Sequence, residues 1–583
     1  MQIKKIDFSG QFELKGLWWD PQRPDTRIPG VLIYDCGSIT LDLFGLLGDR
    51  TPAELGQVQS FMPPLIYGRA EGEYISLYNT TETRRSFFIP SAEDAGDEYS
   101  SVCASILVVG CHAPPLNDLR VPSIRVRYTG LEEWLHQAPI QDDNGKENDK
   151  STIGLRFRFP EKLEVTLPAL NTRLETDYSI CRGSPTFGSR LLRYSSFFRI
   201  MPDEDQSLEW FLKLADRCRD FLTFCFGQPV IYRQFILELG DVQYKDPYVI
   251  PPREAALFFA QRPNRVGDPP SLLDMILSYP SIKPGAQKVI ETWFQKAEEL
   301  ETPIELFLGT FYNRDLYPRF HFLSLAQALE TYARLTKPGQ YLADSDYKSV
   351  KKSMQAAIPC STPSDLKQSL KSRLEYGNEY SLRKQLKTLA SSLKERTSLL
   401  ISDKMAPFID QVVNTRNYFT HYTTNLGSVD HADTQTLFLL THRMRLFLTI
   451  LILKELGVEE ETIGEIILRN QRLNFIYPPK MLAEFQAQFF PHLSTSTTNT
   501  EEPGPMNTVT QAGQGATDNV TSQGLVEVLE RIQAAQKARG YEGRSVEELE
   551  ADEAEARAEG EEYEARWRGI WDRTTPEPPD GKS

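Results

Sequence analysis

The chain has 583 residues, which is too long for one hydrophobic core and predicts two or three domains. Hydrophobic residues make up 40% and aromatic residues 11% of it, so folded globular domains are expected. The net charge of -15 argues against a protein that coats nucleic acid nonspecifically, but it leaves room for a local basic surface.

The sequence indicates a cytoplasmic protein with no membrane partner. Residues 1–8 lack the apolar core of a signal peptide. The longest apolar run, Leu437–Leu453, contains His442, Arg443 and Arg445, so it is typical of a bundle core and not of a membrane span.

The seven cysteines are scattered and form no Cys-x-x-Cys pair. Cys111 stands beside His112, but no second pair of ligands follows at zinc spacing. We therefore expect reduced, mostly buried thiols, no metal site and no cofactor.

Short β-type runs, broken by Pro, Gly, Asn and Asp, dominate the chain to about Ile200. The clearest are Gly30–Tyr34, Ser38–Leu43, Tyr74–Leu77, Ala104–Val109 and Ser123–Tyr128. This spacing predicts an antiparallel sandwich or barrel. An amphipathic helix follows, with Ser207 as N-cap and Gly227 at its end, before Val230–Leu239 returns to strand character. Residues 1–285 are therefore predicted to form a mainly antiparallel β domain with added helices.

From Ala286 the pattern becomes helical, and residues 286–490 are predicted to form an all-α bundle. The predicted helices are 286–300, 302–312, 318–335, 365–376, 382–399, 405–423, 434–456 and 459–472. The fold class is therefore α+β multidomain, a β-rich domain followed by a helical bundle.

The last segment, 491–583, changes composition. It is rich in Ser, Thr, Gly, Asn and Pro to about Gln523 and should be disordered there. Leu525–Trp571 has helical propensity and an acid-rich centre. It is either a solvated acidic helix or a docking or autoinhibitory element that mimics the charge of RNA.

Between Lys348 and Lys404 twelve Lys or Arg residues stand against five acids. This run is either a solvated helix surface or a track for the phosphate backbone of RNA. On the second interpretation the candidate RNA contacts are Arg373, Arg383, Lys384 and Lys387.

Directly after this run, the predicted helix 405–423 has an apolar stripe made by Met405, Phe408, Ile409, Val412 and Val413. Arg416 falls on that stripe, so it must be paired or must line a groove. Helix geometry places Arg416 and His421 about 140° and about 7.5 Å apart, which allows them to flank one phosphate.

These residue types suit RNA cleavage without a metal. Histidine can serve as acid or base near neutral pH, and arginine offers a permanent planar cation to phosphate oxygens. The Asn417 amide could fix the tautomer of His421. The alternative is structural: Arg416 pairs with a carboxylate and His421 caps the edge of the core.

Three further residues are weaker candidates. Glu330, on the predicted helix 318–335, could orient Arg416 or His421, or it could be a surface glutamate. Tyr418 and Tyr422 could stack on an RNA base, or they could fill the bundle.

The segment Arg416-Asn417-Tyr418-Phe419-Thr420-His421 resembles the signature of HEPN domains, which is an arginine, a polar residue, three further residues and a histidine. The N-terminal half resembles the β-rich domain of ApeA-type proteins. The resemblance is carried by Gly16–Pro21, Ile28–Leu32, Leu41–Gly45, Ile66–Arg69 and Leu131–Trp134. Together the two regions span about residues 5 to 475.

The resemblance implies a bacterial antiphage abortive-infection protein whose HEPN domain is a metal-independent endoribonuclease. It implies a homodimer or higher oligomer in which Arg416 and His421 of two chains share one composite site. The expected partners are an RNA substrate, such as tRNA or another host RNA, and a phage-encoded trigger sensed by the N-terminal domain. The alternative is a noncatalytic HEPN module that binds RNA or nucleotide as a sensor or scaffold. A hydrolase with a Ser or Cys nucleophile finds no support, since no Gly-x-Ser-x-Gly or P-loop motif is present.

Overall fold

The computed structural model describes residues 6–47, 62–86, 99–143, 154–182, 191–239, 254–260, 268–313, 316–421 and 434–489. All of these belong to one compact unit, Met1–Thr498. The predicted tail, 491–583, lies outside the described residues. The limits of the two predicted domains, 1–285 and 286–490, stay a prediction.

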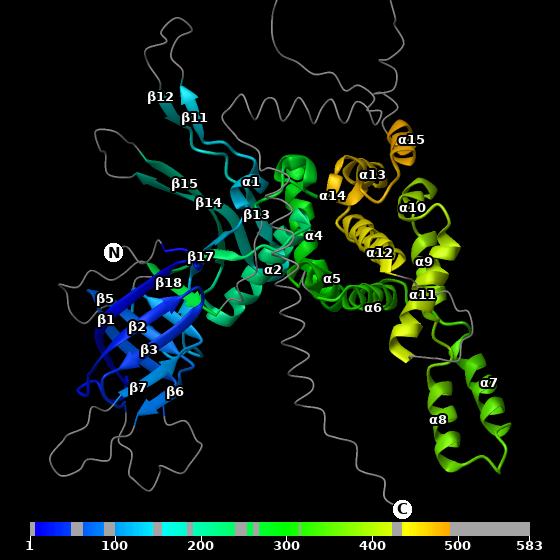
Figure 1. Cartoon of the computed structure of the whole chain (residues 1–583), viewed down its shortest axis with the longest axis horizontal. Coiled ribbons are helices and arrows are strands. Elements are labelled where there is room, and N and C mark those ends of the chain that lie inside the picture. Colours follow the sequence, from blue (N-terminus) through cyan, green and yellow to red (C-terminus); the bar gives the residue numbers. More distant parts are fainter. Residues whose placement is uncertain are drawn as a thin grey trace, which may run out of the picture. The chain divides into compact units, whose positions relative to one another are not determined.

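The N-terminal region is built on one antiparallel sheet, which contains fourteen of the described strands (Figure 1). In sheet order these strands are β13 (Glu164–Leu167), β14 (Thr172–Arg182), β15 (Leu192–Pro202), β10 (Ser123–Tyr128), β17 (Tyr232–Glu238), β18 (Glu254–Phe259), β8 (Ile106–Val109), β5 (Glu73–Tyr78), β4 (Leu65–Ala70), β1 (Gln11–Trp19), β2 (Ile28–Asp35), β3 (Ser38–Leu43), β7 (Tyr99–Cys103) and β6 (Thr81–Ser86). Two small pairs stand apart, β11 (Ile140–Asp143) with β12 (Gly154–Phe157), and β9 (Arg120–Val121) with β16 (Gln206–Ser207).

The part of the sheet from β18 to β7 curls around a core of its own. Inward side chains from strands that are not neighbours, such as Leu14, Leu41 and Phe258, belong to one cluster of buried residues. The predicted antiparallel β domain is thus confirmed, as a single curved sheet and not as two separate sheets. Trp18 is fully buried in this core, and a Cβ added to Gly68 would lie 2.2 Å from its ring.

The amphipathic helix predicted after the strands is α2 (Leu208–Phe226). Both predicted caps are confirmed: the Ser207 hydroxyl accepts from the Trp210 N–H at 3.2 Å, and Gly227 ends the helix with a φ of 61°. A short helix, α1 (Leu131–Leu135), places the buried Trp134, whose indole N–H donates to the Leu277 carbonyl at 3.1 Å.

The C-terminal region is helical, as predicted. The helices are α3 (Tyr279–Ile282), α4 (Ala286–Glu299), α5 (Glu301–Tyr312), α6 (Pro318–Thr336), α7 (Asp344–Ala356), α8 (Ser364–Glu375), α9 (Leu382–Ser391), α10 (Glu395–Ile401), α11 (Met405–His421), α12 (Thr434–Glu455), α13 (Glu460–Arg469), α14 (Gln471–Asn474) and α15 (Pro479–Phe489). Short 3-10 turns are η3 (Pro168–Leu170), η4 (Leu272–Asp274) and η5 (Lys283–Gly285).

The predicted helix 382–399 is wrong as one helix, because α9 ends at Ser391 and α10 begins at Glu395. The Ser392 hydroxyl donates to the Leu389 carbonyl, and the Lys394 backbone N–H donates to the Glu460 carboxylate. These bonds satisfy the groups that a continuous helix would have paired. The helix 459–472 is likewise divided into α13 and α14, and α7 and α15 were not predicted at all.

Helix α12 is long and apolar enough to cross a membrane by length and composition, but 67% of its apolar stretch is buried inside the protein. It packs on α6 and α13. The described structure therefore supports the prediction of a bundle-core helix.

The sheet and the bundle share one hydrophobic core. A single cluster of buried side chains includes Val126 of β10, Phe224 of α2, Trp293 of α4 and Val412 of α11. Within it the Phe224 and Trp293 rings stack with centroids 5.8 Å apart. The helices α2, α4 and α5 thus join the β-rich region to the bundle.

Candidate functional site

Helix α11 positions Arg416 between the core and solvent. Phe408, Val412 and Thr415 are buried on its inner side. The Arg416 side chain is 30% exposed, so it needs a partner on its buried side and can still be reached from outside.

That partner is Glu330 on α6. The Arg416 Nη2 donates to the Glu330 Oε2 at 3.2 Å, and the Glu330 side chain is only 15% exposed. The other oxygen of Glu330 accepts from Arg334 at 3.1 Å, and Arg334 reaches Glu379 at 3.2 Å. Glu330 is therefore a mostly buried ion-pair partner of Arg416 and not an exposed surface glutamate, and its role in orienting Arg416 stays a prediction.

Asn417 lies beside Arg416, with its amide oxygen accepting from the Arg416 Nη1 at 3.2 Å. His421 is one helical turn after Asn417 and is the last residue of α11. The Asn417 amide oxygen therefore serves Arg416. The side chain of His421 and the whole of Tyr422 lie outside the described residues.

The aromatic residues of the motif pack mainly inward. Phe419 meets Phe322 of α6 edge to face, with centroids 5.8 Å apart. Tyr418 is half-buried and contacts Phe419 at 5.6 Å. These contacts fix the end of α11 against α6, and base stacking by Tyr418 or Tyr422 stays a prediction.

The predicted basic track is divided between two places. Arg383, Lys384 and Lys387 lie on α9, which packs against α11 and α6. Arg373 is exposed on α8, which forms with α7 a helical hairpin outside the bundle core (Figure 1). No described residue of α7 or α8 is buried.

The α9 cations are not equally available. Arg383 forms an ion pair with Asp410 and reaches Asn414 at 3.5 Å, both on α11. Lys384 and Lys387 are exposed, and the Lys384 ammonium lies 5.4 Å from the Tyr380 ring centroid. Arg383 therefore holds α9 to α11, while Lys384 and Lys387 can face a substrate.

The arrangement offers oriented positive charge at the outer end of a buried helix. Glu330 and Asn417 take two of the five N–H donors of the Arg416 guanidinium in the described structure. The remaining donors suit the oxygens of a phosphate. Within the described residues no group of three or more His, Cys, Asp or Glu is placed to hold a metal ion.

The sequence did not reveal the ion-pair chain beyond Glu330. The sequence did contain a signal for the Glu330–Arg334 pair, because these residues stand four apart on a helix, where such side chains meet. Glu379 could not be predicted, since it comes from the turn between α8 and α9, which only the fold brings to α6.

Comparison with known families gives two matches. Residues 13–293 match the family described as ApeA N-terminal domain 1, and residues 323–462 match the family described as Apea-like HEPN. The second match contains Glu330, Arg416, Asn417 and His421. No curated protein and no solved structure matches the chain.

Proposed function

Because the chain belongs to the ApeA-like proteins with a C-terminal HEPN domain, we propose that it is a metal-independent endoribonuclease of bacterial antiphage defence. Arg416, Asn417 and His421 are its proposed catalytic residues. The observation that carries the proposal is the Glu330–Arg416 ion pair, which holds a permanent cation beside the histidine position of the HEPN-matched segment.

In the proposed reaction the 2′-hydroxyl of the RNA loses its proton to the imidazole of His421. Its oxygen attacks the adjacent phosphorus, and the bond from phosphorus to the 5′-oxygen breaks. The His421 imidazolium returns this proton, directly or through solvent, to the departing 5′-oxygen, which leaves a 2′,3′-cyclic phosphate and a 5′-hydroxyl. Arg416 stabilises the extra negative charge on the phosphorane through its free N–H donors.

We assign Glu330 the part of a positioning residue. Its carboxylate fixes the guanidinium plane of Arg416 from the buried side, so that the donors facing solvent keep one orientation. Arg334 supports the same carboxylate from its other oxygen.

One helix places Arg416 and His421 on diverging directions, so one copy supplies only part of the groups that surround a phosphate. We propose that two chains face each other through their HEPN domains and form one composite site. The β-rich domain would restrain this site until a phage-encoded trigger binds. The substrate would be tRNA or another host RNA in the cytoplasm.

The decisive experiment maps RNA ends after expression of the wild-type protein and of His421→Ala, with Thr420→Ala as the matched control on the same exposed turn. Wild type and Thr420→Ala should produce new 2′,3′-cyclic phosphate ends, and His421→Ala should not. Equal cleavage by wild type and His421→Ala would refute the proposal. Tight RNA binding with no new ends from any protein would favour a noncatalytic sensor or scaffold.

A further inference from the structure

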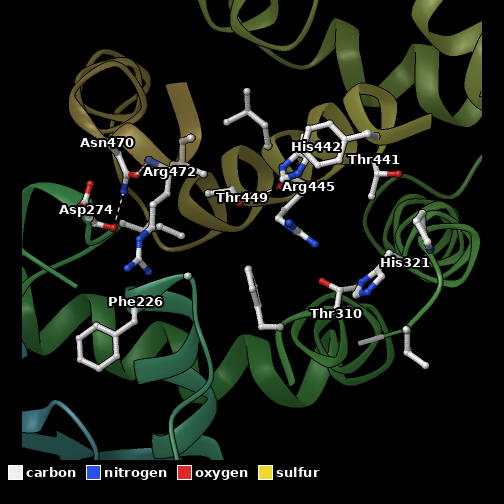
Figure 2. A pocket seen from close by; sticks show the side chains of 18 residues that line it. Phe226, Asp274, Thr310, His321, Thr441, His442, Arg445, Thr449, Asn470 and Arg472 are labelled. Carbon is white, nitrogen blue, oxygen red and sulfur yellow. Dashed lines mark hydrogen bonds between the residues drawn. The ribbon is translucent and has the colours of Figure 1, made fainter. Parts of the chain in front are cut away.

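A cavity of about 610 Å³ lies where the β-rich region meets the helical bundle. Phe226 and Gly227 at the end of α2 and Asp274 of η4 form one side of it. Side chains of α5, α6, α12 and α14 form the other side (Figure 2). Its volume is in the range of sites for small ligands, and Arg416 and Glu330 do not line it.

Two arginines extend into this space from different helices, Arg445 from α12 and Arg472 from α14 (Figure 2). The Arg445 guanidinium lies 5.2 Å from the ring centroid of Phe311, so an aromatic face holds it from one side. The Arg472 Nη1 donates to the Gln228 oxygen at 2.7 Å, and the Arg472 backbone N–H donates to Asn470. Both cations are therefore held in place within the cavity wall.

Two histidines and one carboxylate complete the charged lining. Burial first, and then the charges of Arg445 and His321, lower the pKa of His442 to about 4, so its imidazole is neutral near pH 7. Asp274 offsets one of the two positive charges, and one oxygen of its carboxylate accepts from the Ser271 hydroxyl at 3.0 Å. At neutral pH the lining favours a ligand with negative charge at the two arginines.

Beside His442 the protein exposes two aromatic rings. Phe438, which lines the cavity, is 50% exposed, and Phe475 is 48% exposed. The His442 ring contacts both, with centroid distances of 4.4 Å to Phe438 and 4.8 Å to Phe475, and the two phenylalanine rings lie 6.2 Å from each other. Half-exposed phenylalanines are unfavourable in water, and a flat ring stacked on them would cover this surface.

Three threonines give the cavity acceptors. The hydroxyls of Thr310, Thr441 and Thr449 each donate to a backbone carbonyl of their own helix, at 2.7 to 2.9 Å. Thr449 is fully buried, whereas Thr310 and Thr441 keep a small exposed fraction, so their oxygens, with the proton directed into the helix, can accept a hydrogen bond from a ligand. Such acceptors suit the hydroxyls of a ribose.

We propose that this cavity binds a nucleotide. The phosphates would contact Arg445 and Arg472, the ribose would donate to the threonines, and the base would stack on Phe438 beside His442. This combination of paired cations, hydroxyl acceptors and exposed aromatic rings fits a nucleotide better than an inorganic anion, which would leave the aromatic surface uncovered. The proposal does not depend on RNA cleavage at Arg416.

Isothermal titration calorimetry on the full chain tests the proposal with ADP, ATP, adenosine and pyrophosphate as probes. Wild type should bind ADP or ATP, and bind adenosine and pyrophosphate at least tenfold more weakly. Arg472→Gln and Phe438→Ala should each weaken ADP binding at least tenfold with an unchanged melting temperature. Arg469→Ala is the matched control, because Arg469 is exposed on α13 and does not line the cavity.

Three results would overturn the proposal. The first is no nucleotide binding by folded wild type at millimolar concentration. The second is pyrophosphate binding as tight as ADP binding, which would mean a simple anion site. The third is loss of ADP binding in Arg416→Ala with unchanged binding in Arg472→Gln, which would assign the nucleotide to the HEPN site.

Discussion

Glu330 and Arg416 come from different helices, 86 residues apart in the chain, and form an ion pair with 3.2 Å between Oε2 and Nη2. Glu330 is the more buried partner and also holds Arg334. A mostly buried carboxylate is stabilised by two guanidiniums only while both of them stay in contact with it. The position of the Arg416 side chain on α11 therefore depends on how α6 packs against α11.

Glu330→Gln keeps the size of the side chain and removes its charge. If Glu330 orients Arg416, RNA cleavage should fall about tenfold, which corresponds to about 1.4 kcal/mol in transition-state stabilisation. The rate constant for cleavage should fall more than RNA affinity does. Glu379→Gln, at the exposed end of the same ion-pair chain, should stay within about twofold of wild type, and equal losses in both variants would contradict a positioning role for Glu330.

Arg416→Lys should be nearly as inactive as Arg416→Ala. Lysine keeps the charge but lacks the planar fork that bonds Glu330 and Asn417 and that, on the proposed function, also bonds the phosphate. Both variants should lose about a hundredfold or more in cleavage rate. Circular dichroism should show a retained fold, and a fully active Arg416→Lys protein would mean that only the charge matters.

RNA binding should depend steeply on salt if the exposed lysines of α9 contact the phosphate backbone. Lys387→Ala should lower the slope of log affinity against log salt by about 1, measured by fluorescence anisotropy. Arg383→Ala should mainly weaken the folded state, because Asp410 loses its partner. If RNA affinity did not change between about 50 and about 300 mM salt, a roughly sixfold range, the lysines of α9 would not contact the phosphate backbone.

The protein should lose stability in acid through His442. Its pKa in the folded protein, about 4, is below its ordinary value of 6.5, so the unfolded chain binds the proton more readily. This contribution to stability is complete above about pH 6.5 and decreases as the pH falls toward 4. His442→Gln should reduce the change of the melting temperature with pH between about pH 4 and pH 6.5, measured by differential scanning fluorimetry.

Gly68→Ala should destabilise the curved sheet, since its Cβ would lie 2.2 Å from the fully buried Trp18 ring. We expect a loss of about 1–3 kcal/mol in the free energy of unfolding. Gly309→Ala is the control, because nothing lies within 4 Å of a Cβ at that position in α5. It should leave stability unchanged or raise it by up to about 1 kcal/mol.

Helices and strands could be predicted where a short stretch of sequence is enough to determine them. The alternating strands Ser38–Leu43 and Ser123–Tyr128 and the two caps of α2 are confirmed at the residue. The break at Ser392 was missed because it depends on a bond from the Lys394 backbone to Glu460, which is 66 residues away. Helix α7 was not predicted, although Tyr347, Val350 and Met354 stand at helical spacing in it and none of its residues is buried.

The candidate site could be predicted only in part, because some of its contacts depend on the fold and not on a local signal. The position of Arg416 on an apolar stripe required a partner, and the sequence offered Glu330 as one candidate, which the packing of α6 on α11 brings into contact with Arg416. The cavity that we propose to bind a nucleotide was not predicted. His321, Arg445 and Arg472 come from three separate segments, and each alone is an ordinary residue of a helix.

The stacked rings of Phe224 and Trp293 have a consequence for how the protein can be activated. A fragment that starts at residue 286 would expose the apolar side of α4 to water, so the bundle should not survive excision as a soluble piece. The protein therefore cannot be activated by a simple detachment of the β-rich region from the helical bundle. If the β-rich region restrains the site as proposed, activation requires a rearrangement within one body, and proteolysis near residue 285 should inactivate the protein.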